Sequence, residues 1–345
     1  CYKKLSMSKK NSSVILKNSF KDFSDLNKVY LKFKKKLNIL KKKSLVVAIS
    51  GGPDSLALAA LSKAYSYEKK TKFYYVLVNH NIRRNSTSEA KRVANLLKKH
   101  QINLKVISNH LPIKKNIQGN ARKIRYELLT KFCLRKKIRS ILTAHNLEDQ
   151  VETFLIRLSR GSGLTGLSAM NYSTLLSNNI CLFRPLLDTK KNVLIKICKI
   201  SFGKYLKDPS NIDPKYLRTK IRNLKNPLIK SGISYDQIIK SINNLASSKA
   251  TLEVFYQKVF KDTVKKSNKE ITLNLKKFNK FNNEIKMKII NDSIKILKKN
   301  YYNPRSKKVQ NLIKMIKLRD FNKSTLGGCL FYIKKDHLCI KIEKM

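Results

Sequence analysis

Short apolar runs alternate with amphipathic segments along the first half of the chain. Four runs are rich in β-branched or aromatic residues and are predicted strands. They lie at residues 45–50, 73–79, 104–108 and 140–144. The segments between them carry apolar residues at helical spacing and are predicted helices. They lie at residues 55–65, 87–100, 117–136 and 147–160. This alternation predicts an α/β fold with a doubly wound parallel sheet, whose ligands bind at the carboxyl ends of the strands.

The second half of the chain has a different pattern. Residues 161–179 are rich in glycine and serine, and residues 184–206 resume with an Arg-Pro turn and an amphipathic helix. From residue 226 to about 300 the pattern is helical and rich in lysine. The tail is predicted to hold a helix near residues 309–318 and then a hairpin of two short strands, at residues 329–333 and 338–342.

These patterns divide the chain into four expected regions. They are a basic N-terminal extension with a lead-in helix at 1–43, the α/β domain at 44–223, a small helical domain at 224–300 and a short α+β region at 301–345.

The composition adds a strong positive field. Lys and Arg total 76 against 21 Asp and Glu, which gives a formal net charge of +55. Such a field attracts polyanions, so a nucleic acid is the expected partner. However, 62 of the basic residues are lysine, and AT-biased coding would give the same composition. Individual lysines therefore do not identify a binding face.

The cysteines and the hydropathy bear on the compartment. None of the six cysteines has a metal-ligand spacing, which predicts reduced, mostly buried thiols. No apolar run approaches the roughly 20 residues that span a bilayer. We expect no membrane partner and a cytoplasmic location, or the plastid stroma if the gene is organellar. The chain starts with Cys1, so Met7 is a candidate for the true start.

A glycine-rich turn joins the first predicted strand to the first predicted helix. It consists of Ser50, Gly51, Gly52, Pro53, Asp54 and Ser55. Backbone N–H groups and the positive helix end can hold phosphate oxygens there. The turn lacks the Gly-Lys-Ser/Thr ending of a Walker loop, which favours pyrophosphate as a leaving group over a transferred γ-phosphoryl group. Asp54 would then help to hold Mg²⁺. A tight turn without a ligand is the alternative.

Three carboxylates follow the fourth predicted strand at the same edge of the sheet. Glu148, Asp149 and Glu152 lie at the start of a helix, where they could bind Mg²⁺ and a cationic amine. The alternative is the ordinary preference of acidic residues for helix N-termini. Beside the phosphate loop, we take Asp54, Glu148 and Asp149 as candidate metal ligands, and Asp54 and Asp149 as candidate catalytic residues.

Five segments carry a more specific likeness. They are residues 50–55, 78–83 (VNHNIR), 120–126 (NARKIRY), 144–167, and 208–213 (DPSNID) with Arg218 and Arg222. Together they resemble the tRNA(Ile)-lysidine synthetases, which are PP-loop N-type ATP pyrophosphatases with an adenine nucleotide alpha hydrolase-like fold. The resemblance covers about residues 44–223, and residues 325–329 resemble the family's C-terminal region. Asn79 and Glu148 depart from it, since each replaces a usual aspartate.

The resemblance implies a reaction and its participants. ATP would adenylate the 2-keto oxygen of the wobble cytidine in tRNA(Ile) with a CAU anticodon, and the ε-amine of free L-lysine would displace AMP to form lysidine. The implied cofactors are ATP and Mg²⁺. Residues 44–223 would be the PP-loop catalytic domain and residues 224–300 a substrate- or tRNA-binding domain, and a homodimer is compatible with the sequence.

Glu152, Arg218 and Arg222 are candidates for binding the lysine or the tRNA. Glu152 could hold the ammonium group of the substrate lysine. Arg218 and Arg222 are four residues apart, a spacing that suits an RNA or phosphate contact. Capping of the local helix is the alternative for both arginines.

His80, Arg122 and Arg125 complete the candidate site. The two arginines are three residues apart on one predicted helix face and could contact a phosphate or the α-phosphoryl group. A solvated helix face is the alternative. His80 follows a strand end and serves either the nucleotide pocket or the loop alone.

Two other functions remain open from the sequence. A tRNA 2-thiolation enzyme shares the loop and the adenylation step, but it generally uses cysteines to carry sulfur or a cluster, and no Cys-x-x-Cys occurs here. A basic RNA-binding protein without catalysis is the second. The intact loop together with Asp149 argues against it.

Overall fold

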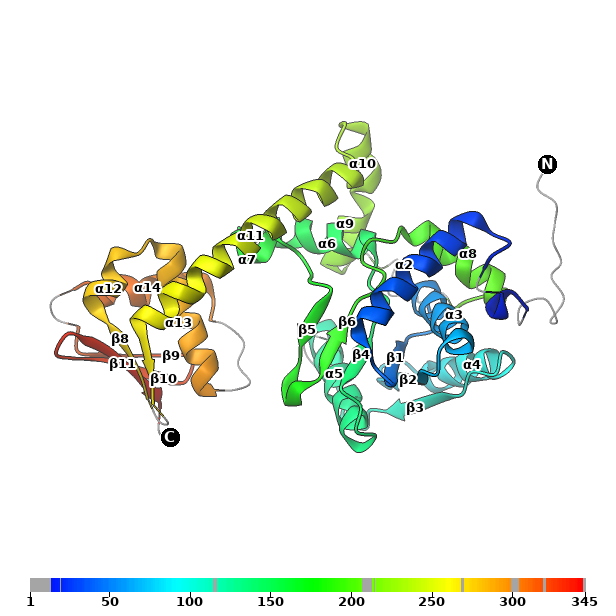
Figure 1. Cartoon of the computed structure of the whole chain (residues 1–345), viewed down its shortest axis with the longest axis horizontal. Helices are drawn as coiled ribbons and strands as arrows, with labels where there is room; N and C mark the ends of the chain where they lie inside the picture. Colours follow the sequence, from blue (N-terminus) through cyan, green and yellow to red (C-terminus); the bar gives the residue numbers. More distant parts are fainter. Residues whose placement is uncertain are drawn as a thin grey trace. The chain divides into compact units, whose positions relative to one another are not determined.

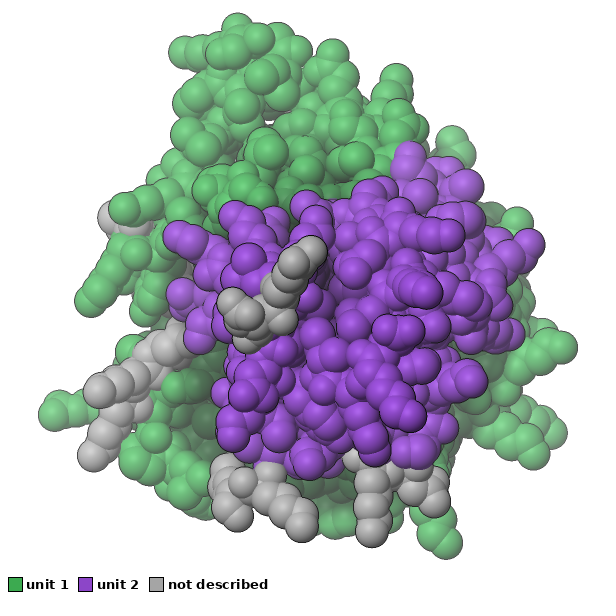
Figure 2. All heavy atoms as spheres, turned by 90° about the vertical axis from the view of Figure 1, so that its left-hand side faces the viewer, with its two compact units in different colours: residues 1–246 green, residues 247–345 purple. Residues whose placement is uncertain are grey.

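The computed structural model describes residues 14–18, 20–113, 117–206, 213, 215–267, 270–298, 304–318 and 321–343. Cys1, Met7 and residues 208–212 of the DPSNID segment lie outside these ranges. The chain forms two compact units, residues 1–246 and 247–345, which are coloured separately in Figure 2. Within the described ranges, no helix combines the length and the apolar character that crossing a membrane requires.

A six-stranded sheet with the order β3-β2-β1-β4-β6-β5 forms the centre of the first unit (Figure 1). The strands are β1 Ser44–Ile49, β2 Lys72–Asn79, β3 Leu104–Ser108, β4 Ser140–Leu142, β5 Ser173–Leu175 and β6 Cys181–Phe183. All neighbours pair in parallel except β5, which is antiparallel to β6. The predicted doubly wound parallel sheet is confirmed. Its strand order reverses between β1 and β4, and ligands bind at such switch points.

The two faces of the sheet are covered by different helices of the first unit. The helices are α2 Ser24–Leu40, α3 Pro53–Glu68, α4 Ser86–Lys98, α5 Ile117–Arg135, α6 Leu147–Leu158, α7 Leu164–Leu167, α8 Lys191–Phe202, α9 Leu217–Asn223 and α10 Lys225–Lys230. The next helix, α11 Tyr235–Thr263, begins in the first unit and ends in the second. Leu45, Val47 and Ile49 pack into a core with α2, α3, α4 and α8. Val46 points the other way, into a core with α5. The continuous apolar run of β1 is therefore buried on both faces.

The second unit is an antiparallel sheet covered by helices. Its strands have the order β7-β8-β11-β10-β9. They are β7 Val264–Lys266, β8 Glu270–Asn274, β9 Lys323–Leu326, β10 Cys329–Lys334 and β11 His337–Ile342. The helices are α12 Leu275–Lys280, α13 Asn283–Lys298 and α14 Ser306–Ile316. One core joins Phe278 of α12, Ile290 of α13 and Ile313 of α14 to Phe331 of the sheet.

Several elements of the second unit test the sequence patterns directly. The predicted hairpin is confirmed, because β10 and β11 pair antiparallel from Cys329 to Lys334. The strands β7 and β8 lie in a region whose pattern predicted helices only, so that prediction was wrong for them.

The predicted thiols are confirmed for the five described cysteines, all of which are free and four of which are buried.

Candidate active site

The glycine-rich turn closes through its own serines. Ser55 Oγ accepts from the N–H of Ser50 at 3.1 Å and donates to the carbonyl of Gly52 at 3.0 Å. Gly51 has a left-handed φ of +84°. A Cβ atom placed on Gly51 would lie 2.7 Å from Val93 Cγ2, inside van der Waals contact. Because the backbone of the loop passes this close to α4 and has a positive φ at Gly51, only glycine fits this position without strain.

The turn ends at the start of α3. Gly52 is the N-cap and Pro53 occupies the first turn of the helix, where its missing N–H costs nothing. The first N–H groups of a helix have no intrahelical partner and form a site for anions. This geometry at the carboxyl end of β1 is what a phosphate cradle requires.

Asp54 lies in the first turn of α3. Its Oδ1 atom is buried and has no hydrogen-bond partner among the described residues. The pKa of its carboxyl is raised to about 6, chiefly by burial and in part by the charges of Asp149 and Glu148. Lys191 and a hydrogen bond from Asn146 act in the opposite direction. Asp54 therefore lies near Asp149 and Glu148, as expected from their positions after adjacent parallel strands.

Asp149 belongs to a capping box at the start of α6. Its N–H donates to Asn146 Oδ1 at 2.9 Å, and its Oδ2 accepts from the N–H of Asn146 at 3.0 Å. The box fixes the carboxylate at the carboxyl end of β4, next to β1. Asp149 therefore has both roles that the sequence left open: it caps the N-terminus of α6 and it belongs to the candidate site.

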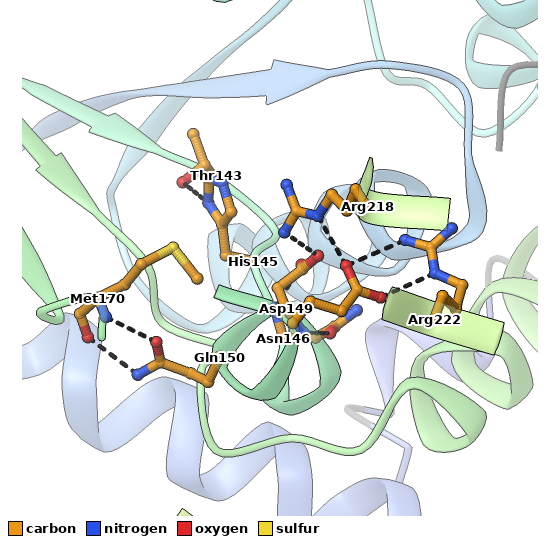
Figure 3. A network of polar contacts seen from close by, with 9 residues as sticks. Thr143, His145, Asn146, Asp149, Gln150, Met170, Arg218 and Arg222 are labelled. Carbon is orange, nitrogen blue, oxygen red and sulfur yellow. Dashed lines mark hydrogen bonds and ion pairs between the residues drawn. The ribbon is translucent and has the colours of Figure 1, made fainter. Parts of the chain in front are cut away.

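Glu152 is the most buried of the three carboxylates that follow β4. Its side chain is 3% exposed and accepts from Arg218 Nε at 2.7 Å and from Arg222 Nε at 2.8 Å. Arg218 also donates to Asp149 Oδ1 at 2.9 Å. Figure 3 shows both arginines pointing from α9 toward α6. The network joins two helices that are more than 50 residues apart in sequence.

Glu148 also contacts the start of α8. Its Oε2 accepts from the backbone N–H of Lys191 at 2.9 Å, at the start of α8. Of the three predicted metal ligands, Asp149 and Glu148 both lie near enough to Asp54 to raise its pKa, and one oxygen of Glu148 also anchors the start of α8. In the described part of the chain, no group of three or more His, Cys, Asp or Glu side chains is arranged to hold a metal ion.

A basic cluster lies at the neighbouring strand ends. Both ring nitrogens of His80 are buried without a partner among the described residues. Burial, and then the charge of Arg125, lower the pKa of His80 to about 4. Arg122 lies 5.0 Å from the ring centre of Tyr126, on the same helix. His80 and Arg125 thus share one environment, and α5 supplies the arginines.

His145 is a residue of this cluster that sequence reasoning left out of the candidate site. Its Nδ1 atom lies 2.9 Å from Thr143 Oγ1. Burial, and then the charges of four arginines, hold the pKa of His145 far below its usual range. These are Arg122, Arg184, Arg218 and Arg125. Its place directly after β4 was the signal that could have identified it.

Asn79, where the related family usually has aspartate, has a structural role. It is buried, its Nδ2 atom donates to Thr87 Oγ1 at 3.2 Å, and its Oδ1 atom accepts from the N–H of Asn81 at 3.1 Å. These contacts hold the turn that carries His80.

The comparisons with known proteins agree with this geometry. The model of the PP-loop domain family matches residues 25–229. The tRNA(Ile)-lysidine synthase of Wolbachia pipientis wMel is 34% identical over 290 residues, covering 83% of this chain and 67% of that protein. The tRNA(Ile)-lysidine synthase of Rickettsia typhi is 32% identical over 306 residues, covering 87% and 69%.

Among solved structures, the chain is similar to the U34-tRNA thiolase NcsA from Methanococcus maripaludis. The TM-score is 0.54 at 20% identity, over 64% of this chain and 78% of that one. At this identity the likeness shows a shared fold.

Proposed function

Because this chain belongs to the PP-loop family and, within it, to the tRNA(Ile)-lysidine synthases, we propose that it forms lysidine on tRNA(Ile) through an adenylated cytidine. The 2-oxygen of the wobble cytidine in the CAU anticodon attacks the α-phosphorus of ATP, and pyrophosphate leaves. The ε-amine of free L-lysine then attacks carbon 2 and displaces AMP. The related sequences favour this reaction over 2-thiolation.

One observation carries the proposal. The loop of residues 50–55 and the capped carboxylate Asp149 lie at adjacent strand ends, and Asp54 of the loop has a buried Oδ1 without a hydrogen-bond partner among the described residues. A cradle of N–H groups beside carboxylates suits a reaction in which pyrophosphate leaves with a bound cation. No protein nucleophile is needed, so the enzyme acts by positioning and electrostatics.

Asp54 and Asp149 are the residues that would hold Mg²⁺. Mg²⁺ in nucleotide sites is usually bound through one or two carboxylates together with phosphate oxygens. A buried carboxylate oxygen without a hydrogen-bond donor fits this role, and Asp54 supplies one. The cation would offset charge on the pyrophosphate. Glu148 is not required, because its carboxylate caps the start of α8.

The basic cluster is the proposed substrate side of the site. Arg122 and Arg125 come from α5 and would meet a phosphate of ATP or of the anticodon loop. His80, with its lowered pKa, is neutral near pH 7 and adds no charge of its own. Placed beside the arginines, it can offer one donor and one acceptor to a nucleotide.

Glu152 remains a candidate for the lysine ammonium, with Arg218 and Arg222 as its neighbours. In the structure its oxygens accept three hydrogen bonds from these arginines. An ammonium contact would use the remaining acceptor position or displace one guanidinium. The geometry therefore favours a role in which Glu152 also fixes the two arginines.

The cleavage of ATP tests the proposal. ATP labelled at the α- or the γ-phosphate is incubated with the protein, Mg²⁺, L-lysine and unmodified tRNA(Ile). We expect AMP and pyrophosphate in equal amounts, and only when the tRNA is present. Release of ADP and inorganic phosphate would contradict an adenylation mechanism.

A further inference from the structure

Lys191 is the first residue of α8, and its backbone is hydrogen-bonded to Glu148 at the start of α6. Its backbone N–H donates to Glu148 Oε2 at 2.9 Å. The carbonyl of Thr189 accepts from the N–H of Leu147 at 3.1 Å. Two hydrogen bonds therefore join the start of α8 to the start of α6. Because α8 also packs along α3, the helix that begins with the phosphate loop, Lys191 is held in the same region as Asp54.

The charge of Lys191 acts on the carboxyl of Asp54. Among the charged groups that act on the carboxyl of Asp54, Lys191 has the largest effect and lowers its pKa, against the effect of burial. The residue is half-buried. The two groups make no ion pair within 4 Å, and in the described part of the chain Lys191 makes no ion pair with any carboxylate.

Three other cations in this part of the structure are already paired. Arg218 binds Asp149 and Glu152, and Arg222 binds Glu152. Lys190, one residue before Lys191, pairs with Asp236 at 3.0 Å. Lys191 is thus a cation near Asp54 that remains available to an anionic ligand.

We propose that Lys191 binds the pyrophosphate part of ATP, together with the loop of residues 50–55. This inference rests on the proposed adenylation, which supplies the ligand. When the cytidine oxygen bonds to the α-phosphorus, the bond from that phosphorus to the bridging oxygen breaks, and its electron pair stays on the pyrophosphate. The ammonium of Lys191 offsets this charge and transfers no proton. A compact ammonium on a long side chain suits such a contact.

Glu148 acquires a role in the same arrangement. By accepting the N–H of Lys191, its carboxylate fixes the first turn of α8 and the position of the lysine. The longer side chain of glutamate at this family position therefore has a structural consequence in this chain.

Direct binding tests the proposal without depending on turnover. Calorimetry with the full chain and Mg²⁺ measures the affinity for pyrophosphate and, separately, for AMP. The variants are Lys191→Met, Lys191→Arg and the neighbouring control Lys190→Met. We expect Lys191→Met to weaken pyrophosphate binding about ten- to hundred-fold, the range for one lost charged hydrogen bond. AMP binding should change less than about twofold, and Lys191→Arg should restore part of the loss.

Three results would overturn the proposal. The first is unchanged pyrophosphate affinity in Lys191→Met. The second is an equal loss of affinity for pyrophosphate and AMP, which would indicate a general effect on the pocket. The third is the same loss in Lys190→Met, which would indicate a general effect of charge. This test is independent of the proposed lysidine reaction. If that reaction failed, a selective loss of pyrophosphate binding in Lys191→Met would still assign Lys191 to this ligand.

Discussion

The geometry of the phosphate loop is tested by Gly51→Ala. An alanine at the observed φ of +84° takes a left-handed conformation that costs about 1–2 kcal/mol. Its Cβ atom would also lie 2.7 Å from Cγ2 of Val93, which is 2% exposed and has little space to move. Overpacking of this kind costs about 1–3 kcal/mol. We expect Gly51→Ala to lower the free energy of unfolding of the first unit by about 2–5 kcal/mol.

Urea denaturation followed by circular dichroism measures this loss, and the neighbouring glycine is the control. At Gly52 a Cβ atom would find only Ser50 Oγ, at 3.9 Å, and the φ of −75° suits any residue. Gly52→Ala should cost less than about 1 kcal/mol, as an N-cap change. In a Val93→Ala background, Gly51→Ala should cost only the backbone part, about 1–2 kcal/mol. The reasoning would be refuted if Gly51→Ala and Gly52→Ala lowered the free energy of unfolding equally. It would also be refuted if Gly51→Ala cost as much in the Val93→Ala background as in the native protein.

Three further predictions concern the charged groups. Asp54→Asn should abolish release of AMP and pyrophosphate while filter binding of tRNA stays within about twofold, because the basic surface is intact; a large loss of tRNA binding would contradict this. Glu152→Ala should lower the free energy of unfolding by about 3 kcal/mol, since it leaves two arginines without their buried partner. The exposed control Glu127→Ala should change it by less than about 0.5 kcal/mol, and a similar loss in both would be evidence against the network. The native protein excludes a proton from His80 until about pH 4, whereas an unfolded histidine binds one near pH 6.5, so stability should fall as the pH drops through this window. His80→Asn should reduce the fall in urea midpoint between pH 7 and pH 5, and an unchanged fall would show that His80 is not the cause.

The parts of the fold that the sequence predicted have local causes. The apolar run of β1, the two glycines and a proline at the first turn of α3 define a strand, a turn and a helix within about 25 residues. The closeness of Asp54 and Asp149 was also predictable, because both follow parallel strands at one edge of the sheet.

The parts that sequence patterns missed depend on pairing over long distances. β8 has only five residues, and its strand character comes from its partner β11, more than 60 residues later. β6 has three residues, too few to establish a period, and joins the sheet only because β4 offers an edge.

The site shows the same division. The sequence identified Glu152 and Arg222 separately, but their pairing requires α9 to lie against α6, and no local spacing encodes that contact. Lys191 belongs to a helix whose pattern is that of ordinary packing, and its place near Asp54 arises from the packing of α8 on α3. Tertiary packing therefore decides which charged residues are paired and which remain available to a ligand.

Incorporation of lysine into RNA tests the central claim most directly. Labelled L-lysine is incubated with the protein, ATP, Mg²⁺ and tRNA(Ile) carrying the CAU anticodon, beside the same tRNA with the wobble cytidine replaced by uridine. The account predicts label in the first RNA, recovered as lysidine after nuclease digestion, and none in the second. No incorporation, or equal incorporation into both RNAs, would contradict it.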